Sequence, residues 1–279
     1  MALPASFAKD GFLPLSSLKK KYKHLLIGTE GQSDTGKSEF GMSAPGPTIY
    51  ICLDRMLDGA LDNPNPPAAR REDIAIKMVP ILLDGTGTQA SYLANWKEFY
   101  DIYTRALANP DVRTVVLDGD SDSWELQRLA EFGKLQQVPA LKYVGPNAAR
   151  RAMYARAFDS GKIVIATNKV KDMYKDDTDS AGKPKLGKDG NTVRVKSGEQ
   201  ESQGFGDQDY LWHIRLRHLY RPASVDLAGN IQEQEWGIRI LKCKANTALI
   251  GDELWGSDCC FETLVRYVYP HIPISEWGY

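Results

Sequence analysis

The features that this 279-residue sequence lacks exclude several classes of protein. It contains four cysteines, of which Cys259 and Cys260 are adjacent, and it has no C-x-x-C pair. Its four histidines show no metal-ligand spacing, so neither a disulfide framework nor a zinc module is predicted. It has no apolar run long enough to cross a membrane, and its first residues lack the apolar stretch of a secretory signal. We therefore expect a cytoplasmic protein with reduced thiols and no membrane contact.

The sequence also lacks an excess of either charge, since 35 lysines and arginines face 36 aspartates and glutamates. A protein that binds nucleic acid over much of its surface would be basic, so any such binding must depend on a local basic patch. Hydrophobic residues make up 42% and charged residues 25%, which is an ordinary globular composition. Length and composition together predict one α/β domain with insertions.

Apolar runs alternate with helical patterns along the chain. Five continuous apolar runs predict buried strands, at residues 24–29, 48–53, 74–83, 114–118 and 163–167. Helices are predicted from Lys37 to before Pro45 and at about 90–108, 123–136 and 147–159. Two later strands, at 211–220 and 236–244, and a short helix near 258–268 form a predicted C-terminal antiparallel extension. This alternation is typical of an α/β fold whose mostly parallel sheet carries helices on both faces. We expect one such domain at residues 24–279, preceded by an N-terminal extension at residues 1–23.

Residues 171–206 interrupt this pattern. The segment is rich in lysine, aspartate, glycine and serine, and it has almost no apolar periodicity. Long segments of this kind inside a compact domain are usually functional or disordered. We therefore predict a long mobile loop there.

A phosphate-binding loop is the most specific signal in the sequence. Residues 31–38 match the pattern G-x-x-x-x-G-K-[ST], and they lie between a predicted strand and a predicted helix. The glycines let backbone N–H groups turn toward phosphate oxygens, the lysine reaches the β- and γ-phosphates, and the final hydroxyl binds Mg²⁺. We therefore predict ATP and Mg²⁺ as the cofactors. The residues expected to contact the nucleotide are Gly31, Ser33, Asp34, Thr35, Gly36, Lys37, Ser38 and Glu39.

Asp118 follows a predicted buried strand, at the edge where α/β sheets place their ligands. A carboxylate there can hold the Mg²⁺ shell through water, so we predict that Asp118 and Ser38 form the metal site. Asp120 and Asp122 are nearby alternatives for the same role.

Two further polar residues end predicted strands. Asp54 is either the base that activates the attacking water or an aspartate at a turn. Asn168 either contacts the γ-phosphate or its water, or it is a satisfied turn amide. The sequence leaves both choices open.

The order of these parts resembles the RecA-like ATPases, and most closely the phage nucleotide-binding proteins that serve as single-strand-annealing recombinases. The resemblance covers roughly residues 22–260. It rests on the phosphate loop and on four short segments, at residues 51–54, 115–118, 165–168 and 240–244. It implies a RecA-like P-loop core in which Asp54 activates water, where a glutamate is usual. It also implies that Asn168 senses the γ-phosphate and leads into a DNA-binding loop.

A K-x-K pair late in RecA-like chains reaches across a subunit interface to the neighbour's nucleotide, and Lys242 and Lys244 match that spacing. The alternation of a strand would place both lysines on one face and Cys243 on the other. The resemblance thus implies a homo-oligomer in which these lysines assist catalysis in trans. The alternative is a pair of solvent-facing lysines on an edge strand, which discourage aggregation.

Basic residues mark two candidate contacts with single-stranded DNA. Lysines in or beside residues 171–206, among them Lys169 and Lys171, are diluted by aspartates, so a solvated loop is an equal alternative. The second cluster consists of Lys142, Arg150, Arg151 and Arg156, with Tyr143 and Tyr154 among them. The tyrosines could stack on bases, and the alternative for this cluster is a solvated helix face.

Three functions fit these features. The first is a phage-type RecA-like ATPase that acts on single-stranded DNA in recombination or replication, in the host cytoplasm and with a single-strand-binding protein as a further partner. The second is a nucleotide-dependent switch or ATPase that acts on a protein partner, which the balanced charge favours. The third, a P-loop kinase for a small molecule, ranks last. A kinase needs an arginine-bearing lid, and residues 171–206 contain only Arg194.

Overall fold

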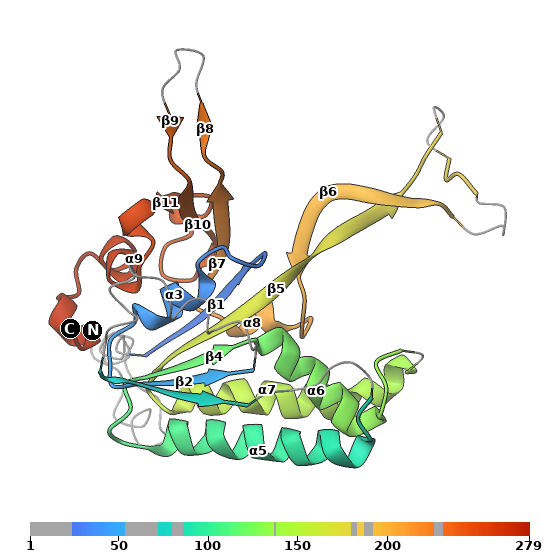
Figure 1. Cartoon of the computed structure of the whole chain (residues 1–279), viewed down its shortest axis with the longest axis horizontal. Coiled ribbons are helices and arrows are strands. Elements are labelled where there is room, and N and C mark those ends of the chain that lie inside the picture. Colours follow the sequence, from blue (N-terminus) through green and yellow to red (C-terminus); the bar gives the residue numbers. More distant parts are fainter. Residues whose placement is uncertain are drawn as a thin grey trace, which may run out of the picture.

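The computed structural model of the chain describes residues 24–53, 72–79, 86–136, 138–179, 183–186, 192–225 and 231–279. The predicted extension at residues 1–23 and the predicted base Asp54 lie outside the described residues. One mixed sheet, with helices on both sides, forms the body of the molecule, and two arms project from it (Figure 1).

Within the described residues the sheet has nine strands, most of which are parallel. Eight lie side by side in the order β11-β10-β7-β1-β5-β4-β2-β3, and β6 pairs with β5. All neighbours from β7 to β3 are parallel, whereas β10 is antiparallel to β7 and to β11. The strands are β1 (Leu25–Gly31), β2 (Thr48–Cys52), β3 (Ile74–Met78), β4 (Thr114–Asp118), β5 (Ile163–Asp176), β6 (Arg194–Ser202), β7 (Ile214–Arg221), β10 (Glu235–Cys243) and β11 (Glu253–Trp255). The predicted mostly parallel sheet with an antiparallel C-terminal part is confirmed.

Helices cover both faces of the sheet because its central strands are apolar on both sides. α5 (Gln89–Ala108), α6 (Asp120–Phe132) and α7 (Val144–Asp159) lie on one face, and α3 (Lys37–Met42) and α9 (Phe261–Val268) lie on the other. Successive residues of a strand face opposite sides, so β1 places Leu26 in the first core layer and Ile27 in the second. Short 3-10 turns occur at Ala140–Tyr143, Thr247–Leu249, Gly256–Asp258 and Ile274–Trp277.

The prediction of a loop at residues 171–206 is wrong for residues 171–176 and 194–202, which form strands. β5 leaves the core and continues outward, where it pairs antiparallel with β6. We call residues 169–176 and 194–202 the β5–β6 ribbon, which forms one of the two arms in Figure 1. Most side chains on both faces of the ribbon are exposed or half-buried, so its strands need no apolar face. Cross-strand ion pairs such as Lys196–Asp172 supplement its backbone hydrogen bonds. Weak apolar periodicity therefore did not exclude strands here.

Several predicted boundaries move by a few residues. α6 begins at Asp120, one residue after the end of β4, and β3 ends at Met78. A short helix, α8 (Gln208–Leu211), occupies the start of the predicted strand at 211–220, so β7 begins at Ile214. Beyond β7 and β10, β8 (Ser224–Val225) pairs with β9 (Ile231–Gln232) and forms the second arm.

Candidate functional site

Residues 31–38, the predicted phosphate loop, connect β1 to α3 at the carboxyl edge of the parallel strands. α3 begins at Lys37, as the sequence predicts, whereas β1 runs to Gly31, two residues beyond the predicted end of the strand. Gly36 precedes the helix with a φ of 83°, a conformation that is costly for residues with a Cβ atom. A side chain at Gly31 would approach Thr35 Oγ1 to 2.7 Å and His218 Cβ to 3.0 Å. The backbone conformation therefore requires glycine at position 36, and close packing requires glycine at position 31.

The side chains of the loop take different positions. Lys37 Nζ donates a hydrogen bond to Gln32 O, which holds the ammonium group over the loop. Ser33 and Asp34 are exposed, and Glu39 is half-buried in the first turn of α3. The one cation of the loop thus lies against the backbone of the loop itself.

The structure brings Ser38 and Asp118 together, although 80 positions separate them in the sequence. Ser38 Oγ donates to Asp118 Oδ2 at 2.9 Å, the Tyr50 hydroxyl donates to the same oxygen, and Thr167 Oγ1 donates to Oδ1 at 2.6 Å. In the described part of the chain, the carboxylate of Asp118 therefore has only neutral hydroxyl groups as hydrogen-bond partners. Burial and the adjacent Asp118 raise the pKa of Tyr50 well above its ordinary value, so this hydroxyl remains a donor.

The two alternative acids have different surroundings. Asp120 is buried, and its Oδ1 lies 2.5 Å from Arg150 Nη2. Asp122 is buried as well and lies 2.7 Å from Lys169 Nζ. Each of these acids is paired with a cation, so the geometry favours Asp118 for the metal role.

Asn168 is not a turn amide, because β5 runs through and beyond it. Its side chain is buried and accepts a hydrogen bond from Ser121 Oγ at 3.3 Å. The register pairs Asn168 with Glu30, beside the end of β1. The β5 residue whose side chain reaches Asp118 is Thr167, since neighbouring residues of a strand face opposite sides.

Two residues that the sequence did not indicate hold carbonyl groups of the loop. His218 on β7 is buried, and its Nδ1 donates to Thr35 O at 3.0 Å, because a carbonyl oxygen can only accept. Burial, and secondarily Lys37, lower the pKa of His218 to about 3, so the ring beneath the loop is neutral. Trp236 on β10 donates from Nε1 to Asp34 O at 3.0 Å. In the sequence, the His218 contact spans 183 positions and the Trp236 contact spans 202. No local pattern could therefore have indicated them.

Lys242 lies at the end of β10 and Lys244 just beyond it; both reach the same neighbour, α8, and Cys243 between them is buried, as the predicted alternation requires. Both ammonium groups donate hydrogen bonds to carbonyl groups of α8 in their own chain. Burial, and secondarily Lys244, lower the pKa of Lys242. Trp236, which contacts the phosphate loop, is near the start of β10, whereas the lysines are at and just beyond its end. The two lysines therefore lie away from the phosphate loop of their own chain.

The structure corrects the predicted DNA contact at Arg150. Its side chain is 0% exposed and bound to Asp120, so it does not face a ligand in solution. Tyr154, predicted to stack on bases, is also buried, and its hydroxyl donates to Asp120. Lys142 and Arg151 are exposed. A buried ion pair on the inner face of α7 has the same sequence pattern as a surface cluster, which explains the error.

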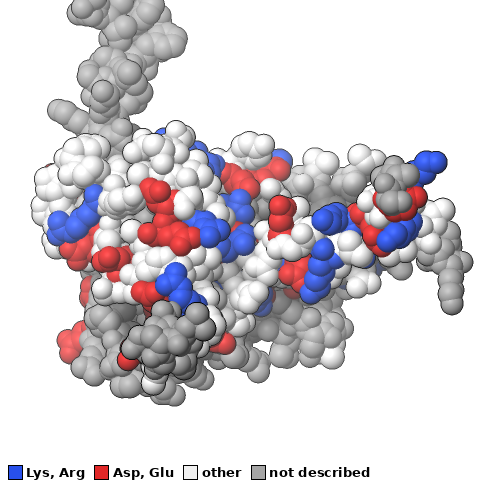
Figure 2. Space-filling view, turned by 90° about the horizontal axis from the view of Figure 1, so that it is seen from above, with Lys and Arg blue, Asp and Glu red and all other residues white. Residues whose placement is uncertain are grey.

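The basic residues of the β5–β6 ribbon lie next to acidic ones. Lys171 Nζ is 3.2 Å from Glu201, and Lys196 Nζ is 2.5 Å from Asp172. Figure 2 shows basic and acidic side chains intermixed along this arm. The described part of the ribbon thus presents mixed charge and no continuous basic stripe.

The described residues include no group of three or more His, Cys, Asp or Glu side chains placed to hold a metal ion. Ser38 and Asp118 nevertheless supply hard oxygen ligands of the kind that Mg²⁺ combines with substrate phosphates. The site therefore fits Mg²⁺ that arrives with a nucleotide.

None of the helices in the described ranges is both long and apolar enough to span a bilayer.

In comparisons with known proteins, no family model matches the chain, and neither does any curated protein.

Proposed function

We propose that the chain is a RecA-like P-loop ATPase that binds ATP and Mg²⁺ at residues 31–39. The contact between Ser38 and Asp118 is the observation that carries this proposal. It joins the last residue of the loop motif to an acid at the end of another strand. Since only neutral hydroxyl groups bind this carboxylate within the described residues, its negative charge is available to a cation.

Each residue of the site has a role in this proposal. The backbone N–H groups of the loop and the ammonium group of Lys37 bind the phosphates, and Lys37 stabilises charge on the transferred phosphoryl group. Ser38 and Asp118 would hold Mg²⁺, which neutralises charge on the phosphate oxygens when bound. Tyr50 and Thr167 keep the carboxylate of Asp118 in one orientation.

We further propose that the active form is a homo-oligomer. Lys242 and Lys244 lie away from the loop of their own chain, so a nucleotide that they assist would belong to a neighbouring copy. Asp54 as the base for water and Asn168 as the γ-phosphate contact complete the proposed site. These two roles rest on the resemblance to RecA-like proteins.

The proposed target is single-stranded DNA, in recombination or replication in a host cytoplasm, together with a single-strand-binding protein. The exposed Lys142 and Arg151, and Lys169 and Lys171 at the base of the ribbon, are the proposed contacts with DNA phosphates. A protein partner is the second candidate, and one observation favours it. The ribbon pairs its cations with acids, which suits a protein surface of mixed charge better than a polyanion.

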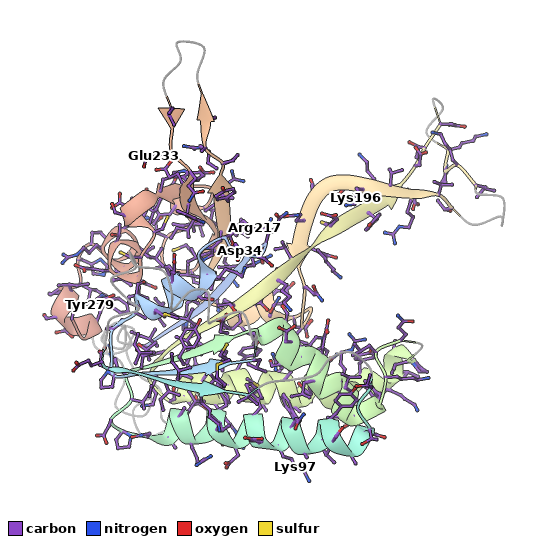
Figure 3. The ribbon with its side chains drawn as sticks, in the orientation of Figure 1. Asp34, Lys97, Lys196, Arg217, Glu233 and Tyr279 are labelled. Carbon is purple, nitrogen blue, oxygen red and sulfur yellow. The ribbon has the colours of Figure 1, made fainter. Side chains whose placement is uncertain are left out.

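The test measures ATP binding and hydrolysis by the parent, Lys37→Ala and Lys97→Ala, with and without Mg²⁺. Lys97 is exposed on α5, far from the loop, and so controls for the removal of a lysine (Figure 3). We expect Lys37→Ala to lose hydrolysis without a change in its urea midpoint, and Lys97→Ala to behave as the parent. Parental hydrolysis by Lys37→Ala would overturn the site.

A single-stranded oligonucleotide added to the same assay separates the candidate functions. A rate that rises with the oligonucleotide supports the DNA proposal. An unchanged slow rate supports a protein partner. ATP consumption that requires a small acceptor molecule would instead identify a kinase.

A further inference from the structure

One face of the sheet packs against α3. Beyond the phosphate loop, this face carries an exposed pair of aromatic side chains. Along β7, residues on this face pass from 0% exposed at Leu216 to 5% at His218 and 47% at Tyr220. Along β10, they pass from 0% at Ile238 to 37% at Trp236. Tyr220 and Trp236 are cross-strand partners, with ring centroids 5.9 Å apart. We call this pair the aromatic platform.

Trp236 is held in place beside the loop. Its Nε1 donates to Asp34 O at 3.0 Å, and its own carbonyl accepts a weak hydrogen bond from Cys259 Sγ at 3.2 Å. Its Cδ1 atom lies 3.9 Å from the point where a Cβ would stand on Gly36. The indole thus touches the middle of the phosphate loop, while more than a third of the surface of Trp236 remains exposed. Asp34, which accepts its hydrogen bond, is labelled in Figure 3.

We propose that the aromatic platform stacks against a nucleobase, namely the base of the nucleotide whose phosphates the loop holds. This inference rests on the proposed nucleotide site and adds the part that binds the base. Every base has a π-face, so stacking on an indole binds adenine and guanine alike. A base tethered to phosphates at the loop is also present at a high effective concentration beside Trp236. This proximity favours the nucleotide's own base over a base of a DNA strand, which offers the same chemistry.

The test compares the binding of ATP, GTP and inorganic triphosphate, each with Mg²⁺, to full-length protein by titration calorimetry. Trp236→Ala should weaken ATP and GTP by about 5- to 150-fold, and triphosphate by less than about 2-fold. Trp236→Phe keeps an aromatic face but loses the hydrogen bond to Asp34, and it should retain most of the ATP affinity. Tyr267→Ala is the matched control, because it removes an exposed aromatic side chain from α9. This variant should bind all three ligands as the parent does.

Four outcomes would overturn the platform. Equal losses for ATP and triphosphate in Trp236→Ala would show that Trp236 only braces the loop. No loss for either ligand would show that the base lies elsewhere. A loss confined to the binding of an oligo(dT) strand would assign the platform to DNA. If the parent binds neither ATP nor triphosphate, the proposed nucleotide site itself fails. If the parent binds triphosphate and Lys37→Ala does not, the nucleotide site stands even where the platform fails, so failure of the platform and failure of the nucleotide site remain distinguishable.

Discussion

Asp118 ends β4 and Asp120 begins α6 two positions later, yet among the described residues only Asp120 has a cationic partner. Asp120 begins α6 and is bound by the fully buried guanidinium group of Arg150. Asp118 receives hydroxyl donors from Ser38, Tyr50 and Thr167. A carboxylate with a built-in counter-ion serves packing, whereas a carboxylate held by neutral donors keeps its charge for a ligand. Among neighbouring acids, the kind of partner thus separates a residue used for packing from one whose charge is available to a ligand, as proposed for Asp118.

The largest effect is expected at Asp120. Asp120→Asn leaves the buried guanidinium group of Arg150 without a counter-charge and should lower the free energy of unfolding by about 3–5 kcal/mol. Urea denaturation measures this change. Asp122→Asn on the same helix is the matched control, because the partner of Asp122, Lys169, is about half exposed. This control should cost less than about 1 kcal/mol. Equal stability of the two variants would remove the structural role of Asp120.

The next effect is expected at Asp118, and it is catalytic. Asp118→Asn should lower Mg²⁺-dependent ATP hydrolysis by roughly 10- to 100-fold while its free energy of unfolding stays within about 1 kcal/mol of the parent. Stability is kept because the surrounding hydroxyl groups can rotate to donate or accept. Turnover as a function of Mg²⁺ concentration measures the effect. A variant that is as active as the parent, but as unstable as Asp120→Asn, would reverse the comparison.

A smaller effect concerns pH and the neutral ring beneath the loop. Burial lowers the pKa of His218 to about 3, against about 6.5 in the unfolded chain. The unfolded state therefore binds more protons between these values. The stability that depends on the neutral ring is complete above pH 6.5 and is lost as the pH falls toward 3, by about 1.4 kcal/mol per pH unit.

His218→Gln should flatten the dependence of unfolding free energy on pH by about one proton between pH 6 and pH 4. His213, whose pKa burial lowers to about 4, is present in both proteins, so the difference between them isolates His218. Urea denaturation at a series of pH values provides the measurement. Identical slopes would mean that the ring is charged, and the loop would then have a second cation beside Lys37.

The smallest effect on stability is expected in the ribbon, where the lysines of the ion pairs are more than half exposed and their acidic partners are about a third to a half exposed. Lys171→Gln should change the free energy of unfolding by less than about 0.5 kcal/mol. If the ribbon binds single-stranded DNA, the slope of log K against log salt should become shallower by about 0.7. Lys97→Gln should leave that slope as in the parent. An unchanged slope in Lys171→Gln would remove this lysine from the DNA surface and favour a protein partner.

The parts of the molecule that the sequence predicted well depend on local patterns. Residues 31–38 form a contiguous motif, and the apolar run before Asp118 is the signature of a buried strand, so the position of the loop and the place of Asp118 at a strand end follow from short segments. The order of strands and helices follows from the same periodicities. Those patterns require no knowledge of distant contacts.

The errors arose where exposure or distant contacts decide the structure. The spacing of basic residues on α7 does not show which of them faces inward, so Arg150 was placed on the surface. The ribbon lacks an apolar face, so its strands had no periodic signal. His218 and Trp236 meet the loop only after the C-terminal strands pair beside β1, which is a property of the whole sheet.

One consequence of the long strand β5 is mechanical. The strand runs without glycine or proline from Ile163 in the core to Asp176 in the ribbon, and Thr167 along its length holds Asp118. The first part of β5 is fixed in the core of the sheet, and the ribbon part extends about 25 Å beyond it. A sideways load on the free end produces its greatest bending moment where β5 leaves the core, next to the carboxylate. A force applied to the far end of the ribbon therefore bends β5 most near Thr167 and Asp118, and a slight tilt there becomes a large displacement at the tip.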